Sequence, residues 1–206
     1  MERSKKSFFL VLEGLDKCGK STQARLLEHF LRRNRIPCLL TREPGGTGLG
    51  ERIRDLLLKT KGHVADRAEL LLYEASRAQH VTEKIAPALA AGKFVICDRF
   101  TLSTVAYQGL GRGIALSDVK GLNDFACHGV SPDLTIVFDL PIGECERRMT
   151  GTRDRMERER SFLRKVRKAY LRLVGRMRDC VLLDAARPPD AIHGHIVKLL
   201  VDRGAL

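Results

Sequence analysis

Short apolar runs alternate along the chain with longer stretches in which apolar side chains recur every three or four residues. The runs do not alternate strictly with polar residues, which is typical of strands buried on both faces of a parallel sheet. We predict strands at residues 8–12, 38–41, 94–97, 134–140 and 181–183.

The intervening stretches have the periodicity of helices with one buried face. We predict helices at residues 20–33, 50–60, 66–91, 117–128, 143–149, 158–178 and 189–203. This alternation predicts an α/β fold, a doubly wound five-stranded parallel sheet flanked by helices, with ligands at the carboxyl ends of the strands. The glycine-rich stretches 44–50 and 109–113 are predicted to be functional loops. Because no linker or repeat is visible, we expect one domain over residues 1–206.

Composition narrows the class of protein. Hydrophobic residues make up 44% and charged residues 30% of the 206 residues, the balance of a globular protein. The apolar run at 8–12 ends at Glu13 and is far shorter than the roughly 20 residues of a membrane-spanning helix or the core of a signal peptide. The six cysteines are scattered and predict reduced thiols. We therefore expect a cytoplasmic protein without a membrane partner.

Positive charge is concentrated in one segment. Residues 147–178 contain thirteen basic and three acidic side chains, so this segment carries +10 of the formal net charge of +12. Such a segment could bind nucleic acid, could close over a polyphosphate, or could be a solvated helix face. Composition leaves these three interpretations open.

Residues 14–21 read Gly-Leu-Asp-Lys-Cys-Gly-Lys-Ser, a G-x-x-x-x-G-K-[ST] phosphate loop between a predicted strand and a predicted helix. Backbone N–H groups of such a loop converge on phosphate oxygens, Lys20 reaches the β- and γ-phosphates, and the Ser21 hydroxyl binds Mg²⁺. The sequence therefore predicts binding of a nucleoside triphosphate with Mg²⁺. The residues expected to contact it are Gly14, Leu15, Asp16, Lys17, Cys18, Gly19, Lys20, Ser21 and Thr22.

Three side chains inside this loop invite further interpretation. A carboxylate at Asp16 beside the γ-phosphate would be repulsive unless it binds an acceptor hydroxyl or a cation. Lys17 adds either a second positive charge at the phosphates or ordinary loop solubility. The thiol of Cys18 predicts sensitivity to thiol reagents.

Further blocks follow the loop in order between about residues 7 and 200. They are Leu-Glu-Gly-Leu-Asp at 12–16, Thr-Arg-Glu-Pro-Gly-Gly-Thr at 41–47, Leu-Leu-Leu-Tyr-Glu-Ala-Ser-Arg-Ala-Gln-His at 70–80, Asp-Arg-Phe at 98–100, Ala-Tyr-Gln-Gly at 106–109 and Asp-Arg-Met-Glu at 154–157. With these blocks the chain resembles the thymidylate kinases, P-loop nucleoside monophosphate kinases that phosphorylate dTMP with ATP. The resemblance implies a dTMP kinase of the P-loop NTPase type with a short basic lid at about 149–157.

Arg42 and Arg99 each follow a predicted strand, where an open α/β sheet binds ligands. A guanidinium fork can hold a phosphate through two hydrogen bonds. The resemblance implies that both arginines bind the dTMP phosphate, with Arg99 nearest the transferred group.

Tyr73 and Arg77 are four residues apart on a predicted helix, so they share a face and could stack on a pyrimidine and bond its carbonyl edge. The resemblance implies that both contact thymine, although the family usually has Phe at position 73. The resemblance also implies that the base and deoxyribose are bound by Ser103, Thr104, Tyr107 and Gln108. It implies that Asp16 contacts the sugar 3′-OH or orders the acceptor. The Tyr107 ring is expected to fill the space that a ribose 2′-OH needs.

The resemblance also assigns parts of the donor side. Arg148 is expected to stack on the ATP adenine, and Arg153 and Arg155 lie in the lid loop. Asp98 is expected either to bind Mg²⁺ through water or to bond the phosphate loop. The catalytic set is therefore Asp16, Lys17, Lys20, Arg99, Arg153 and Arg155. Whether Lys17 or the lid arginines supply the main cation stays open, and family members are usually homodimers.

Two other functions compete with an ATP-dependent dTMP kinase. A kinase for another nucleotide or nucleoside is disfavoured by Tyr107 and by two arginines placed for an acceptor phosphate. A nucleic-acid-binding P-loop protein would use the +10 segment as its footprint, but it leaves Tyr73, Arg77 and Tyr107 without a role. We therefore expect ATP and dTMP as partners, and no stable nucleic acid.

Overall fold

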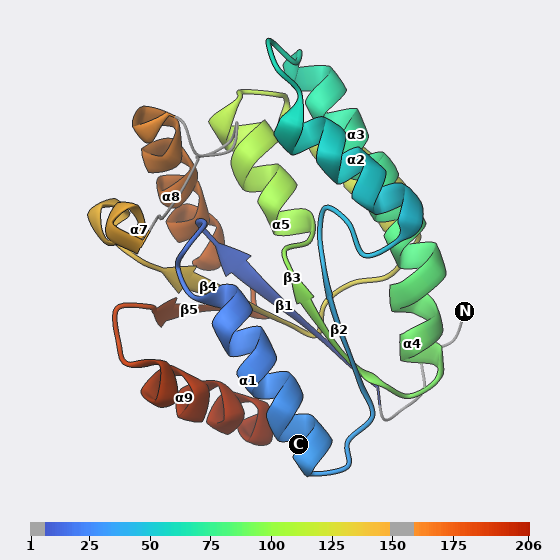
Figure 1. Cartoon of the computed structure of the whole chain (residues 1–206), viewed down its shortest axis with the longest axis vertical. Helices are drawn as coiled ribbons and strands as arrows, with labels where there is room; N and C mark the ends of the chain where they lie inside the picture. The colour runs from blue at the N-terminus through green and yellow to red at the C-terminus, as the bar shows by residue number, and fades with distance from the viewer. Residues whose placement is uncertain (1–6, 149–158) are drawn as a thin grey trace.

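The computed structural model of the protein describes residues 7–148 and 159–206. Its strands form one parallel sheet in the order β2-β3-β1-β4-β5 (Figure 1). They are β1 (Phe8–Gly14), β2 (Cys38–Arg42), β3 (Phe94–Asp98), β4 (Leu134–Asp139) and β5 (Cys180–Asp184). The predicted α/β class and all five predicted strands are confirmed.

Alternate residues of β1 explain why its apolar run is continuous. Phe9 and Val11 belong to the core cluster on one face of the sheet, whereas Leu10 and Leu12 belong to the cluster on the other, with Leu27. Successive side chains of a strand point to opposite faces. Both faces of β1 are therefore buried, as expected for a parallel sheet covered by helices on both sides.

The helices that cover the sheet follow the predicted order. They are α1 (Lys20–Arg33), α2 (Gly48–Lys59), α3 (Asp66–His80), α4 (Ala86–Ala90), α5 (Thr101–Thr104), α6 (Leu116–Cys127), α7 (Ile142–Arg148), α8 (Arg160–Val174) and α9 (Pro189–Asp202), with π-helical segments η1 (Val81–Ile85) and η2 (Val105–Gly111). Helices α1 and α9 lie side by side in Figure 1 and pack together. Within 7–148 and 159–206, no helix is both long and apolar enough to cross a membrane.

Three predictions from the pattern need correction. The loop predicted at 44–50 ends at Thr47, because α2 begins at Gly48 and the Thr47 side chain caps it by accepting from the N–H of Gly50. The helix predicted at 66–91 is continuous but changes to π geometry at η1, just before Pro87, which has no N–H to bond the preceding turn. The stretch 109–113 is not a loop throughout, because η2 extends to Gly111. A Cβ atom on Gly109 would lie 2.7 Å from Leu116 Cδ2, so this glycine permits close packing instead of a flexible turn.

The register of the sheet brings the ends of four strands together. Asp98 at the end of β3 pairs with Arg42 of β2 and with Leu12 of β1, and Gly14 pairs with Phe138 of β4. The carboxyl ends of these parallel strands therefore form one edge, and the loops that follow them form the site described below.

Candidate active site

The loop after β1 has the conformation of a phosphate-binding cradle. Gly14, Lys17 and Gly19 all have positive φ values, of 133°, 63° and 103°. A Cβ atom on Gly14 would lie 2.5 Å from the carbonyl oxygen of Phe138, so only glycine fits there. Gly19 is the N-cap of α1. The loop thus directs the positive end of α1 toward the carboxyl edge of the sheet.

The side chain of Lys20 is held by the backbone of the phosphate loop itself. Its side chain is 5% exposed, and Nζ donates to the carbonyl oxygens of Leu15 (2.8 Å) and Gly14 (3.1 Å). Nζ also lies 4.0 Å from the carboxylate of Asp98. The ammonium group is therefore fixed inside the loop, where a polyphosphate would meet it.

Ser21 and Asp98 lie in direct contact. The Ser21 hydroxyl donates to Asp98 Oδ2 over 2.7 Å. A hydroxyl and a carboxylate are the oxygen donors that Mg²⁺ prefers, so the pair fits the predicted metal site. The sequence also allowed a second role for Asp98, a hydrogen bond to the phosphate loop. The bond to Ser21 is such a contact, because Ser21 belongs to that loop.

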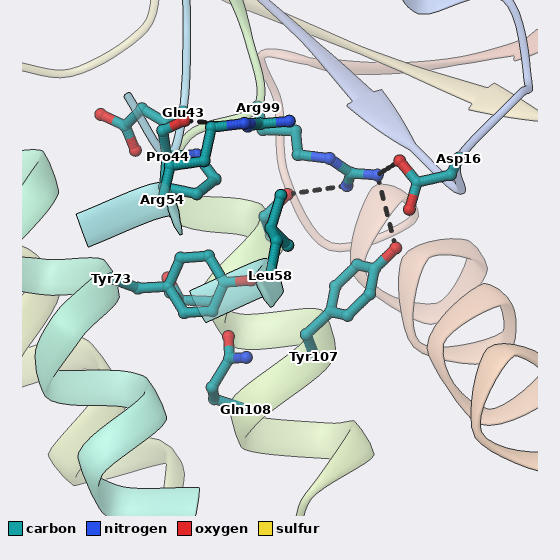
Figure 2. A pocket seen from close by; sticks show the side chains of 11 residues that line it. Asp16, Glu43, Pro44, Arg54, Leu58, Tyr73, Arg99, Tyr107 and Gln108 are labelled. Carbon is teal, nitrogen blue, oxygen red and sulfur yellow. Dashed lines mark hydrogen bonds and ion pairs between the residues drawn. The ribbon is translucent and has the colours of Figure 1, made fainter. Parts of the chain in front are cut away.

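Asp16 and Arg99 form an ion pair at the centre of the edge. Arg99 Nη2 donates to Asp16 Oδ1 over 2.8 Å, and the two side chains are 14% and 31% exposed. Figure 2 shows Arg99 reaching across the pocket from its strand end to meet Asp16. Arg99 follows β3 with a φ of 75°, a conformation that is uncommon for a residue other than glycine.

The Asp16–Arg99 ion pair makes stability depend on pH in the acid range. Burial would raise the pKa of Asp16, but the charges of Arg99 and Lys20 lower this pKa from 3.8 to about 2. A lowered pKa contributes stability that is present above pH 3.8 and is lost as the pH falls through about 2. The free energy of unfolding of wild type and of Asp16→Asn can be measured by urea denaturation at each pH. We expect the difference between the two proteins to shrink by about 2 kcal/mol between about pH 5 and pH 2. Parallel pH curves for the two proteins would contradict this expectation.

A buried carboxylate supports the segment that carries Arg99. Glu13 is fully buried and accepts hydrogen bonds from the backbone N–H groups of Phe100 (2.9 Å) and Ser103 (3.0 Å). It also accepts from the hydroxyls of Ser103 (2.6 Å) and Tyr170 (2.8 Å). Burial raises the pKa of Glu13, and this effect outweighs the charge of Arg99 and the hydrogen bonds, which lower the pKa. Glu13 therefore ties β1, the segment after β3 and α8 together beneath Arg99.

One pocket lies on the side of α2, α3 and η2. It encloses about 480 Å³ of space and is partly open to solvent. Figure 2 shows its walls, with Tyr73 on one side, Tyr107 on the other and Gln108 below. Its lining residues are Asp16, Glu43, Pro44, Arg54, Leu58, Tyr73, Arg99, Ser103, Thr104, Tyr107 and Gln108.

A second, larger and more polar pocket lies over the phosphate loop. It holds about 1330 Å³ and is lined by Asp16, Lys17, Gly19, Lys20, Ser21, Thr22, Arg42, Glu43, Arg54, Asp98, Arg99 and Arg148. Four residues line both pockets: Asp16, Glu43, Arg54 and Arg99. The two pockets therefore meet at two carboxylates and two guanidinium groups.

The structure brings most of the predicted site residues to these two pockets. Arg42 lies at the mouth of the second pocket, half exposed and paired with Glu51 at 3.0 and 3.1 Å. Arg148 lines the same pocket on an exposed turn of α7. Arg153, Arg155 and the whole of the predicted lid at 149–157 lie outside the described residues.

Arg77 does not line either pocket. It is 2% exposed, and its guanidinium donates to Glu43 (2.9 Å), Glu74 (2.7 Å), Thr104 (3.2 Å) and Asn123 (2.5 Å). Burial lowers the pKa of Arg77, but the two carboxylates outweigh burial and raise it. Sharing a helix face with Tyr73 therefore does not bring Arg77 to the pocket wall, and its contact with thymine stays a prediction.

The thiol of Cys18 is less accessible than its place in the loop suggests. Cys18 is 1% exposed, belongs to the core cluster with Leu10 and Leu12, and has a pKa raised by burial. A buried, protonated thiol is a poor nucleophile. The structure therefore argues against the predicted sensitivity to thiol reagents. It does not affect the prediction that the backbone of Cys18, as part of the phosphate loop, contacts the triphosphate.

Sequence reasoning missed several residues of the site. Arg54 lines both pockets and donates to the carbonyl oxygen of Pro44 over 2.9 Å. Its position three residues after Glu51 on α2 places both on one helix face, a signal that could have drawn attention to it. Glu13 belongs to the block at 12–16, but no pattern in the sequence predicts its contact with Tyr170, which lies 157 residues away.

Comparison with known proteins adds independent information. The family model described as thymidylate kinase matches residues 12–196. A thymidylate kinase of Fervidobacterium nodosum is 45% identical over 193 residues, which cover 93% of this chain and 97% of that relative. A thymidylate kinase of Pseudomonas fluorescens is 47% identical over 197 residues, which cover 93% and 94%.

Solved structures agree with the sequence relatives. The crystal structure of thymidylate kinase from Ehrlichia chaffeensis matches with a TM-score of 0.75 and 34% sequence identity, covering 94% of this chain and 98% of that one. The residues that the family model matches include the phosphate loop and every residue that lines the two pockets. This chain belongs to the thymidylate kinase family.

Proposed function

We propose that the protein transfers the γ-phosphoryl group of ATP to dTMP, giving dTDP. The observation that carries this function is the junction of the two pockets, where Asp16 and Arg99 lie between the phosphate loop and the pocket of Tyr73 and Tyr107. A kinase must hold a donor and an acceptor with their phosphates in contact. Two adjoining pockets that share their charged residues supply that arrangement.

The donor triphosphate is assigned to the larger pocket. Backbone N–H groups of residues 14–22 would bind its phosphates, Lys20 would bind the β- and γ-phosphates, and Arg148 would stack on adenine. Ser21, and Asp98 through water, would hold Mg²⁺, which would neutralise negative charge on the donor phosphates. Lys17 lines the same pocket with an exposed side chain, so its ammonium group would add positive charge near these phosphates.

The acceptor nucleotide is assigned to the smaller pocket. Tyr73 would stack on thymine, Gln108 would bond its edge, and the Tyr107 ring would exclude a ribose 2′-OH. The hydroxyls of Ser103 and Thr104 are bonded to Glu13 and to the carbonyl oxygen of Thr101, at 2.6 and 2.8 Å. These two residues therefore shape the wall of the pocket rather than offering unbonded hydroxyls.

Catalysis would consist of positioning and charge stabilisation, since phosphoryl transfer requires little covalent chemistry from the protein. Arg42, Arg54 and Arg99 would hold the acceptor phosphate in line with the donor. Arg99 can exchange its bond with Asp16 for bonds to the transferred group. Asp16 would then be available to order the acceptor or its 3′-OH. The part of Arg153 and Arg155 remains a prediction about residues beyond the described ranges.

Assembly and location are proposed on separate grounds. Exposed apolar side chains on α2 (Leu56, 54%), α3 (Leu71, 56%) and α6 (Phe125, 82%) support a homodimer, the usual state in this family. All six cysteines are free, which supports a reducing compartment such as the cytoplasm. We also propose that residues 1–206 act as a single kinase domain.

An ATP-coupled assay with dTMP, dUMP, dCMP, UMP and thymidine tests the function. We expect a strong preference for dTMP and no turnover of thymidine, which brings no phosphate for the arginines. Turnover of UMP at the rate of dTMP would overturn the role of Tyr107. Turnover of no acceptor by a protein that binds ATP would instead favour the nucleic-acid interpretation, which predicts a DNA affinity that falls steeply with salt.

A further inference from the structure

A buried carboxylate lies behind the pocket, on the side of Gln108. Glu69, in the first turn of α3, is completely buried. Its Oε1 accepts a hydrogen bond from Gln108 Nε2 over 2.7 Å. Arg112 at the end of η2 completes the arrangement, with Nε 3.4 Å from Oε1 and Nη2 3.4 Å from Oε2 of Glu69.

This contact fixes the orientation of the Gln108 amide. A carboxylate can only accept hydrogen bonds, so it selects the amide rotamer that directs the NH₂ group toward Glu69. The carbonyl oxygen of Gln108 must then point the other way. Figure 2 shows this oxygen pointing up into the pocket, toward the side of Tyr73 and Leu58.

The oxygen that faces the pocket can distinguish between pyrimidines. Thymine and uracil carry a hydrogen-bond donor at N3, whereas cytosine carries an acceptor there. A fixed carbonyl oxygen accepts from N3–H of the first two and repels the lone pair of the third. Buried polar groups left without a partner are costly, so such an arrangement discriminates strongly.

We propose that Glu69 is a positioning residue that sets base specificity by holding the Gln108 carbonyl oxygen toward the acceptor, so that bases with an N3–H donor are selected over cytosine. The inference rests on the proposed function, because it assumes that the acceptor base occupies the pocket of Tyr73 and Gln108. Arg112 stabilises the buried Glu69 and is itself stacked on the Phe162 ring, at 4.3 Å from the ring centre.

The test uses Glu69→Gln, because a glutamine at position 69 can donate as well as accept. The Gln108 amide can then turn over and present its NH₂ group to N3 of cytosine. We expect kcat/KM for dTMP relative to dCMP to fall about ten- to a hundredfold in this variant. The ratio of dTMP to dUMP should stay unchanged, since both bases have N3–H.

A matched control is Asp66→Asn on the same helix. Asp66 pairs with Arg112 at 3.5 Å and has no contact with Gln108 in the described part of the chain. This variant should keep the wild-type ratio of dTMP to dCMP. If Glu69→Gln only damages the pocket in general, activity on dTMP, dUMP and dCMP falls in parallel and the dTMP to dCMP ratio stays unchanged. An unchanged ratio in this variant overturns the proposal.

A second variant covers the case in which Glu69→Gln does not fold. Glu69→Met combined with Arg112→Met removes both charges of the Glu69–Arg112 ion pair, a change that proteins often tolerate. Asp66 also loses Arg112 as a partner, but its side chain is 46% exposed, so water can solvate this carboxylate. It also frees the Gln108 amide, so the same fall in the dTMP to dCMP ratio is expected, and a wild-type ratio overturns the proposal. A wild-type protein that phosphorylates none of the three nucleotides would contradict the proposed function itself.

Discussion

Arg99→Ala is expected to lower kcat for dTMP phosphorylation by about 10³- to 10⁵-fold, the range seen when phosphotransferases lose an arginine that stabilises the transferred group. The reason is its position: the guanidinium is 14% exposed, lines both pockets and already bonds Asp16. No other described arginine except Arg54 lines both pockets. Steady-state kinetics with saturating ATP and dTMP would measure the effect.

Two further variants make this result specific. Arg99→Lys keeps the positive charge but loses the planar fork, so it should recover only part of the activity. Arg33→Ala removes an exposed arginine from the last turn of α1, outside both pockets, and should leave kcat unchanged. A folded Arg99→Ala protein whose kcat falls less than about tenfold would exclude Arg99 from the reacting centre.

Lys20→Met is expected to lower kcat by about 10²- to 10³-fold, the usual loss for one preorganised charge at the transition state. Its Nζ is fixed by two carbonyl oxygens of the phosphate loop and is 5% exposed, so no other group can readily replace it. The measurement is kcat at saturating ATP, together with ATP affinity by titration. Wild-type kcat in a folded Lys20→Met protein would contradict the assignment.

Lys93→Met is the matched control. Lys93 is exposed and immediately precedes β3, at the edge of the sheet opposite the site, so its variant should behave as wild type. Lys17→Met addresses the cation that the sequence left open. A loss similar to that of Lys20→Met would assign the main cation to the phosphate loop, whereas a small loss would favour the lid arginines.

The sequence alone determined the parts of the site whose chemistry depends on local spacing. The phosphate loop needs glycines, Lys20 and Ser21 within one turn between a strand and a helix, and that spacing is written in residues 14–21. The strand pattern placed Arg42 and Arg99 at strand ends, and parallel strands bring such ends to one edge. Local geometry and strand direction are therefore readable before any packing is known.

Packing between distant segments decided the rest. Arg77 shares a helix with Tyr73 but turns into a buried cluster with Glu43, so helical spacing alone overestimated its access to the pocket. The stretch 109–113 was predicted to be a functional loop, yet its first glycine allows Leu116 to pack closely against it. Periodicity identifies the face of a helix, but it cannot say which neighbour covers that face.

The contacts that orient the reactive groups are the least visible in the sequence. Glu13 reaches Tyr170 across 157 residues, and Glu69 reaches Gln108 across 39. Each pair consists of ordinary side chains on separate elements, and a buried carboxylate must find its donors wherever the fold brings them. The sequence alone determined that the phosphate loop and two arginines at strand ends, Arg42 and Arg99, meet at one edge. Only the tertiary structure decided that the buried carboxylates of Glu13 and Glu69 hold the segment after Arg99 and the Gln108 amide, because those partners meet through packing and not through spacing.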